Sequence, residues 1–328
     1  MREKVLITGA SGFVGYHLIN EALKNNLEVY AAVRKSSSID HLNGIEVKYV
    51  YPDFKDQASL AQLLKDNGIN YIIHAAGATK ARSQNEYDTI NAAHTVNLAK
   101  AAVNAGPQFK KLVLISSLAA VGPINSLNGI ITNDTVPNPV TAYGRSKLAA
   151  EQQLKTVEGL NYTILRPTAV YGPRDKDIFI FFKQVVKGIE PYIGNKAQKL
   201  TFIYVTDLAE VSVKALFAGS GKTYIISDGN FYSRYELGNI TKSVLNLKAI
   251  KFHLPVNLVK VIAAIAEKVS SLSNKASALN IEKLKELTAA NWNCEIEQAK
   301  HDLGFYPKYD LDAGLTETLK WYKANNWL

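Results

Sequence analysis

Tyr143 and Lys147 are the two residues whose types and spacing most directly suggest chemistry. They stand four residues apart in the segment AYGRSKLAAE, about one helical turn, so both side chains project from one face of a helix. A phenol titrates near pH ~10 in water, and a neighbouring ammonium group stabilises its phenolate form. The pair therefore predicts a site where Tyr143 exchanges a proton with a substrate oxygen while Lys147 supplies positive charge.

Such a site needs a third group to hold the substrate oxygen. A run rich in branched residues, Lys111–Ser116, predicts a strand, and Ser117 follows it directly. We predict that the Ser117 hydroxyl hydrogen-bonds the substrate oxygen, with Ser116 as the alternative donor. The catalytic set expected from the sequence is therefore Ser117, Tyr143 and Lys147.

A glycine-rich turn near the N-terminus predicts the partner in this chemistry. It lies between a predicted strand, Lys4–Thr8, and a predicted helix, Val14–Asn25, with its glycines spaced GxxGxxG. Such glycines let the backbone approach a pyrophosphate closely, and the helix N-terminus supplies amide donors and a favourable dipole. We predict that a dinucleotide binds here, against Gly9, Ser11, Gly12, Phe13, Val14 and Gly15.

The end of the second predicted strand, Glu28–Val33, indicates which dinucleotide binds. An NAD site usually carries an acid there, to accept hydrogen bonds from the ribose. This chain has Val33 followed by Arg34, Lys35 and Ser36. A guanidinium can bind a 2′-phosphate with paired hydrogen bonds, so NADP(H) is predicted as the preferred cofactor, with NAD(H) as the alternative. The alternative to phosphate binding is that Arg34 stacks on the adenine or points into solvent.

Two further segments are candidates for cofactor contacts. Asp53, after the third predicted strand, Val47–Tyr51, is expected either to pair with the adenine amino group or to cap a turn. The fourth predicted strand, Tyr71–Ala75, ends in small residues that let the backbone pass close to the cofactor: Ala75, Ala76 and Gly77.

These motifs together resemble the extended short-chain dehydrogenase/reductase family, which includes NAD-dependent epimerases and dehydratases. The likeness continues in the segments Arg166–Pro173 and Tyr204–Ala209. It implies a Rossmann domain, a variable substrate-binding portion, and catalysis by the three residues above. It also implies that Asn91 is structural or part of a proton path. The nicotinamide end would be lined from Pro167 to Val170.

Two residues depart from the nucleotide-sugar members of that family. Ala169 stands where those enzymes commonly carry an asparagine that contacts the nucleotide phosphates, and Val121 precedes Gly122 where they often have tyrosine. An arginine at position 34, in place of an acid, resembles the dihydroflavonol-reductase-like and 3β-hydroxysteroid-dehydrogenase-like branches of the family more closely. Four aromatic residues fall either in the substrate pocket or in the core: Phe179, Phe181, Phe182 and Tyr192.

The elements that position these residues alternate along the chain. Strand-like and helical segments follow one another, which predicts an α/β fold with a doubly wound parallel sheet of Rossmann type. We expect residues 1–170 to form the dinucleotide-binding domain and residues 171–328 a smaller, mostly helical substrate-binding portion. Residues 200–228 are expected to return to the first domain. The alanine-rich helices Glu86–Ala105 and Ala142–Thr156 could form the surface of a homodimer.

Composition excludes several other classes. The 328 residues carry a net charge of +9, but the basic residues are spread along the chain, which favours a small-molecule partner over nucleic acid. The single cysteine, Cys294, allows no internal disulfide, and the six histidines lack metal-ligand spacing, so no metal is expected. We see no signal peptide and no apolar run of membrane-spanning length. We therefore expect a cytoplasmic protein without stable membrane insertion.

The sequence thus favours an NADP(H)-dependent oxidoreductase that transfers hydride at a secondary alcohol or ketone carbon. A nucleotide-sugar epimerase or dehydratase with tightly bound NAD(P) is the alternative within the enzymes. A non-catalytic NADP(H)-sensing or scaffold protein is the alternative from another class.

Overall fold

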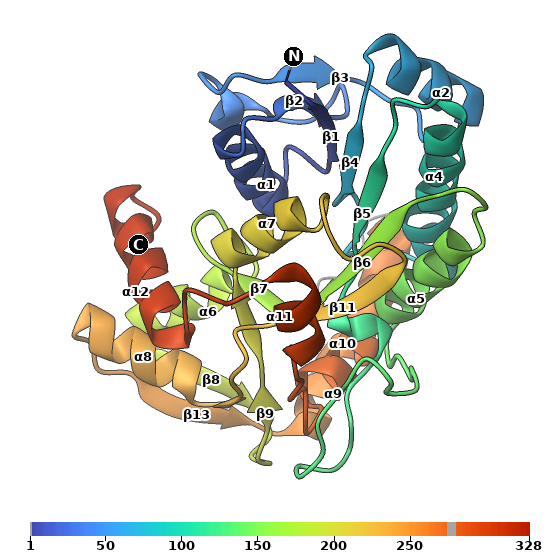
Figure 1. Ribbon diagram of the computed structural model, residues 1–328. Coiled ribbons are helices and arrows are strands. Elements are labelled where there is room, and N and C mark those ends of the chain that lie inside the picture. The colour runs from blue at the N-terminus through green and yellow to red at the C-terminus, as the bar shows by residue number, and fades with distance from the viewer. Residues whose placement is uncertain (1, 274–279) are drawn as a thin grey trace.

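The computed structural model describes residues 2–273 and 280–328. Its centre is a seven-stranded parallel sheet with strand order β11-β6-β5-β4-β1-β2-β3 (Figure 1). The strands are β1 (Lys4–Thr8), β2 (Glu28–Ala32), β3 (Lys48–Val50), β4 (Tyr71–His74), β5 (Lys111–Ile115), β6 (Tyr162–Pro167) and β11 (Lys222–Ile226). This confirms the predicted doubly wound fold. The strand order reverses between β1 and β4, the place where such sheets bind ligands.

Helices cover both faces of the sheet, because alternate side chains of each strand point to opposite sides. In β1, Val5 and Ile7 face one buried cluster and Leu6 faces the other. The first cluster is closed by α1 (Phe13–Lys24), α7 (Val205–Lys214) and α11 (Glu297–Leu303). The second is closed by α2 (Gln57–Asp66), α4 (His94–Asn104) and α5 (Ala142–Lys155). The two layers are visible on either side of the sheet in Figure 1.

The predicted helix Glu86–Ala105 is interrupted in a way that matters for the site. It consists of α3 (Gln84–Asp88), a π-helical turn η2 (Thr89–Ala93), and α4. Single π turns inside helices occur often at functional positions. This one carries Asn91, whose side chain is buried.

The later chain builds a third buried cluster beside the sheet, rich in tyrosine and phenylalanine. Its helices are α6 (Phe179–Val186), α8 (Glu236–Leu245) and α12 (Leu311–Ala324). Three short ladders accompany them: β7 (Ala169–Tyr171) with β10 (Phe202–Tyr204), β8 (Ile189–Ile193) with β13 (Ile250–Leu254), and β9 (Lys199–Leu200) with β12 (Tyr232–Ser233). Two helices follow β13, α9 (Val256–Ser273) and α10 (Ile281–Leu287), and two short 3-10 turns complete the fold, η1 (Asp40–Leu42) and η3 (Leu118–Ala120).

Only part of the segment 200–228 lies in the large sheet. β11 pairs with β6 at the sheet edge, whereas β10 pairs with β7 in a separate ladder. β11 lies at the edge beside β6, where Ile226 lies opposite Pro167. The described chain after residue 232 is mostly helical, as expected, with β12 and β13 as its strands.

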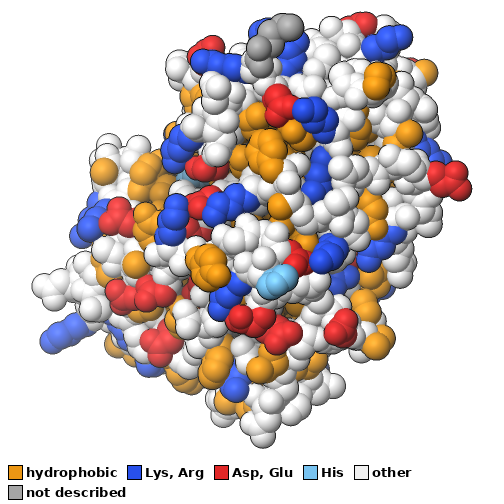
Figure 2. Space-filling view, in the orientation of Figure 1, with side chains coloured by type: hydrophobic (Ala, Val, Ile, Leu, Met, Phe, Trp, Pro, Cys, Tyr) orange, Lys and Arg blue, Asp and Glu red, His pale blue; other side chains and the backbone are white. Residues whose placement is uncertain are grey.

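The surface charge is spread out, as the sequence predicts for a protein that does not bind nucleic acid. Figure 2 shows Lys and Arg side chains scattered over one face and interspersed with Asp and Glu, without a continuous basic block. Within residues 2–273 and 280–328, none of the helices combines the length and apolar content that crossing a bilayer requires. Among the same residues, no cluster of three or more His, Cys, Asp or Glu side chains is arranged to hold a metal ion.

Candidate active site

The turn between β1 and α1 is built so that backbone groups are left open. Gly9 adopts φ +67°, and a Cβ there would lie 2.8 Å from the Ala75 carbonyl oxygen. A Cβ on Gly15 would lie 2.1 Å from the Gly9 carbonyl oxygen. Both positions thus require glycine. The helix that follows has Gly12 as its N-cap, with no capping side chain and no acid in its first turn. Its first amides are therefore available to an anionic group.

The remaining predicted residues of this turn lie around those amides. Ser11 and Val14 are half-buried, and the Phe13 ring lies edge-on to His17. Across the turn, the end of β4 presents Ala75 and Ala76 half-buried and Gly77 exposed.

A buried hydrogen-bond chain fixes the end of β4 beside this turn. The Ala76 amide donates to Thr8 Oγ1 (3.0 Å), and Thr8 Oγ1 lies 2.7 Å from His74 Nδ1. On the other side His74 Nε2 lies 2.9 Å from Thr95 Oγ1, which donates to the Asn91 carbonyl. These directions leave His74 neutral with its proton on Nε2. Burial, with the nearby charge of Lys147, lowers the pKa of His74 to about 3, so it is a packed structural residue.

Asn91 joins the β4 loop to the helix that carries Tyr143. Its Oδ1 accepts from the Ala78 amide (2.7 Å), and its Nδ2 donates to the Ala78 carbonyl (3.0 Å) and to Ser146 Oγ (2.9 Å). All of its polar atoms are satisfied, which explains why this buried amide is tolerated. The π turn orients Asn91 for these bonds.

Tyr143, Ser117 and Lys147 converge at the carboxyl ends of β4 and β5. Lys147 Nζ donates to the Ile115 carbonyl (2.9 Å), and a Cβ on Gly77 would lie only 3.3 Å from that nitrogen. Burial lowers the pKa of Lys147 to about 8, while the charge of Glu151 opposes the shift. Burial raises the pKa of Tyr143 to about 12, and a hydrogen bond with the Ser117 side chain opposes that rise.

The two serines have different surroundings. Ser116 is buried, and its hydroxyl donates to Glu151 Oε1 (2.5 Å). Glu151 in turn holds Arg166 through a bidentate pair, with Nη2 to Oε2 at 2.6 Å. Ser117 is half-buried beside Tyr143, and its Oγ accepts from the Ala119 amide (3.1 Å), which leaves its hydroxyl proton free to be donated elsewhere. Of the two, Ser117 is the one with a hydroxyl directed to the tyrosine.

The other predicted cofactor residues follow the ends of strands of the large sheet or lie beside them. Arg34 follows β2, is exposed, and its guanidinium has no partner among the described residues. Asp53 is also exposed, and its Oδ1 accepts from the Lys55 amide (2.9 Å), as a turn-capping aspartate does. At the end of β6 and in β7, Pro167 is buried and Val170 is half-buried. Between them Thr168 Oγ1 is buried and has no hydrogen-bond partner among the residues that the structure describes.

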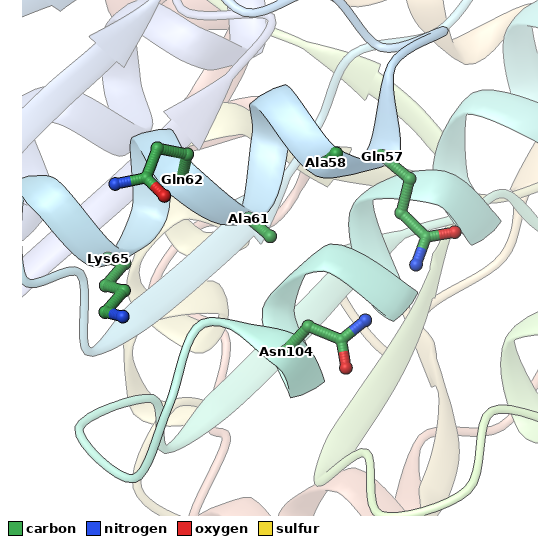
Figure 3. Close-up of a pocket in the computed structure, with 6 residues that line it drawn as sticks. All are labelled: Gln57, Ala58, Ala61, Gln62, Lys65 and Asn104. Carbon is green, nitrogen blue, oxygen red and sulfur yellow. The ribbon is translucent and has the colours of Figure 1, made fainter.

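These features fit a bound dinucleotide. Uncapped amides at α1 suit a pyrophosphate, and a buried hydroxyl without a partner suits the carboxamide of a nicotinamide. A hollow of about 470 Å³ lies elsewhere, between α2 and the end of α4 (Figure 3). Its lining contains none of the predicted site residues: Gln57, Ala58, Ala61, Gln62, Lys65 and Asn104.

α10 is a part of the site that the sequence did not reveal. Glu282 accepts from the Ala142 amide at the start of α5 and pairs with Arg145 (2.6 Å). Glu286, one turn later, is near enough to raise the pKa of Tyr143. Because α10 lies about 140 residues after Tyr143 in the chain, no local spacing could have linked them. Both carboxylates are ion-paired, Glu282 with Arg145 and Glu286 with Lys283 (2.6 Å), so α10 brings paired charges close to Tyr143.

The four aromatic residues expected near a pocket or in the core pack in the core. Phe182 is buried in the third cluster, and Phe179 and Phe181 pack against it. Tyr192 is buried beside Phe181, with ring centroids 6.2 Å apart. The Phe179 ring lies 4.8 Å from that of Tyr322.

Comparisons with known proteins agree with this geometry. The sequence profile of the NAD dependent epimerase/dehydratase family matches residues 5–227. A ceramide reductase of Caulobacter vibrioides is 28% identical over 100% of this chain and 96% of its own length. A UDP-glucose 4-epimerase of Vibrio cholerae is 26% identical over 99% of this chain and 98% of its own length.

Solved structures extend the comparison to the fold. The crystal structure of a UDP-glucose 4-epimerase with UDP-glucose from Thermotoga maritima superposes with a TM-score of 0.80. The match covers 98% of this chain and 99% of the other, at 19% identity. At that identity the likeness is evidence for the fold alone.

Proposed function

The chain is an enzyme that belongs to the NAD dependent epimerase/dehydratase family, and we propose that within this family it is an NADP(H)-dependent ketone reductase. The proposal is supported by the hydrogen bond between Ser117 and Tyr143, by the position of the Lys147 amine at the end of β5, and by the uncapped N-terminus of α1. We further propose that its substrate is a ketone on a lipid, such as a long-chain keto amide, and that its product is the secondary alcohol.

The cofactor, when bound, supplies the hydride that the ketone carbon receives. For this chain the residues proposed to hold its pyrophosphate are Gly9 to Gly15, and Arg34 is proposed to hold the 2′-phosphate. Thr168, with Pro167 and Val170, would contact the nicotinamide end. The protein backbone from Ala75 to Gly77 would pass close to the cofactor. Asp53 remains a proposed adenine partner.

The protein side of the reaction is a proton transfer. Tyr143 keeps its proton at neutral pH, because burial holds its pKa at about 12. It can therefore donate that proton to the carbonyl oxygen as the oxygen becomes an alkoxide. Ser117 donates a hydrogen bond to the same oxygen. Charged Lys147 stabilises the phenolate that remains on Tyr143.

Two observations favour a lipid ketone over a nucleotide sugar. Ala169 has no side-chain amide to bind a phosphate, unlike the asparagine that nucleotide-sugar enzymes of the family commonly carry there. A relative that aligns over all of this chain is a ceramide reductase. The UDP-glucose 4-epimerase likeness makes epimerisation the second candidate.

The test is a direct comparison of substrates. We expect the purified enzyme to oxidise NADPH with a long-chain β-keto amide presented in mixed micelles, and to leave UDP-glucose unchanged. Conversion of UDP-glucose to UDP-galactose without net NADPH oxidation would support the second candidate and overturn the first.

Arg34→Asp tests the cofactor preference. Removing the guanidinium takes away charge-assisted hydrogen bonds and adds a repulsive charge, so kcat/KM with NADPH should fall about 10- to 100-fold. The new acid should raise kcat/KM with NADH. Lys155→Ala, at an exposed lysine in the last turn of α5, is the matched control and should change neither value. Equal use of both cofactors by the wild-type enzyme would contradict the assignment.

The pH dependence of reduction tests Lys147. The free enzyme needs this amine charged, and burial lowers its pKa to about 8. The charged form is present below that value, so kcat/KM for the ketone should be level at lower pH and fall as the pH rises through about 8. Tyr143 contributes no ionisation in this range. A profile that stays level well above pH 8 would mean that the charge on Lys147 is not required.

A further inference from the structure

The outer face of α9 is apolar although it is exposed to solvent. Val259 and Ala263 fill its inner face and are 3% and 0% exposed. The opposite face carries four large apolar side chains at helical spacing that are 47% to 58% exposed: Leu258, Val261, Ile262 and Ile265. A surface helix ordinarily carries polar side chains on its outer face. An exposed apolar stripe of this kind marks a contact surface.

The strand that precedes α9 continues the apolar surface. Only Pro255 separates β13 from α9. In β13, Ile250 and Phe252 point to the same side and are 79% and 54% exposed. Ile250 pairs with Ile189 of β8, which is also exposed. We call Ile189 together with the exposed apolar residues from Ile250 to Ile265 the α9 surface.

The charged side chains within the segment that forms this surface have one sign, and Glu267 follows at its end. From residue 246 to residue 266 the chain contains Lys248, Lys251 and Lys260 and no Asp or Glu. All three lysines are exposed. Glu190, in the neighbouring strand, is buried and pairs with Lys242, so it does not offset them. Apolar side chains flanked by lysines complement an anionic lipid interface. A second copy of this chain would instead bring like charges together.

The α9 surface is also connected to the catalytic helix. The Ile281 amide at the start of α10 donates to Glu267 of α9 (3.0 Å). The next residue, Glu282, binds the first turn of α5 through Ala142 and Arg145. Figure 1 shows α9 and α10 together on the side of the molecule where α5 begins. A membrane held on α9 would thus lie on the side of the protein from which α10 reaches Tyr143.

We propose that the α9 surface binds the interface of an anionic phospholipid bilayer, lying among the headgroups without spanning the membrane. The inference rests on the proposed function, because a ketone on a water-insoluble lipid must be collected from a membrane. The same surface would hold the enzyme where its substrate is concentrated.

Vesicle binding tests the proposal. The full-length enzyme is sedimented with vesicles of phosphatidylcholine alone or of equal parts phosphatidylcholine and phosphatidylglycerol. We expect binding to the anionic vesicles, weakened by salt. The double variant Val261→Ser/Ile265→Ser should lower the partition coefficient at least about tenfold. Lys260→Gln should lower it about fivefold at low salt. Val136→Ser, at a side chain that is 83% exposed outside this surface, is the matched control and should bind as wild type.

Two results would overturn the proposal. One is that the wild-type enzyme does not sediment with anionic vesicles, or that the double variant binds as tightly as wild type. The other is that light scattering finds a dimer that the double variant converts to a monomer, with no vesicle binding. Circular dichroism establishes that each variant is folded. NADPH oxidation with a ketone in micelles tests the reductase hypothesis separately from the membrane-binding hypothesis, because the double variant should keep the reductase activity. Vesicle binding without any ketone turnover would overturn the reductase proposal and leave the surface assignment intact.

Discussion

Replacing Tyr143 with phenylalanine is expected to lower kcat for ketone reduction between about 100-fold and 10,000-fold. The substitution removes the phenolic proton and keeps the ring, which lies edge-on to Tyr87 with centroids 6.3 Å apart. Packing should therefore be preserved. The affinity for NADPH, measured by fluorescence titration, should stay within about twofold of wild type, because the backbone turn at Gly9 to Gly15 is untouched.

The matched control for Tyr143→Phe is Tyr87→Phe. The Tyr87 hydroxyl donates to the Thr79 carbonyl (3.2 Å), so this variant also loses one phenolic hydroxyl from the same aromatic pair. It should keep most of the activity. Wild-type kcat in Tyr143→Phe, with correct folding, would show that another group supplies the proton.

Removing the Glu151 side chain is expected to cause the largest loss of stability. Glu151 is 1% exposed, and it accepts hydrogen bonds from Arg166, 5% exposed, and from Ser116. Glu151→Ala leaves a buried guanidinium without its counter-charge. The free energy of unfolding should fall by about 3–5 kcal/mol, measured by urea denaturation. Because Glu151 raises the pKa of Lys147, any folded Glu151→Gln enzyme should also lose reductase activity at lower pH than wild type.

Two controls separate the buried pair from general effects. Glu297→Ala removes an exposed partner of Lys300 and should cost less than about 1 kcal/mol. The double variant Glu151→Leu/Arg166→Met removes both charges and should recover most of the lost stability. A loss below about 1 kcal/mol in Glu151→Ala would mean that water or a rearranged side chain compensates Arg166.

The parts of the fold predicted well are those set by short-range patterns. β1 has the predicted bounds, because the apolar run Val5–Ile7 is followed by a turn in which Gly9 adopts a left-handed conformation. α5 begins one residue after Thr141, whose side chain caps it by accepting from the Gly144 amide. α6 begins at Phe179, and its aromatic residues belong to the third cluster or pack against it.

The parts missed depend on contacts between distant segments. The strand Phe202–Tyr204 lies beside β7, whereas β11 lies at the sheet edge, and no pattern within the segment encodes that difference. The same holds for the site. Glycine and tyrosine–lysine spacing identified the residues that could do chemistry. The roles of Glu151, which pairs with Arg166 of β6, and of Glu282, which binds the start of α5, emerge only from the folded chain.

The most direct measurement of the central claim follows an isotope. The enzyme is incubated with a long-chain β-keto amide and NADPH carrying deuterium at both C4 positions, and the product is analysed by mass spectrometry. One deuterium on the carbinol carbon of the product alcohol, with one equivalent of NADPH consumed and loss of the reaction in Tyr143→Phe, is the predicted result. A product without deuterium, or turnover that persists in Tyr143→Phe, would contradict the account.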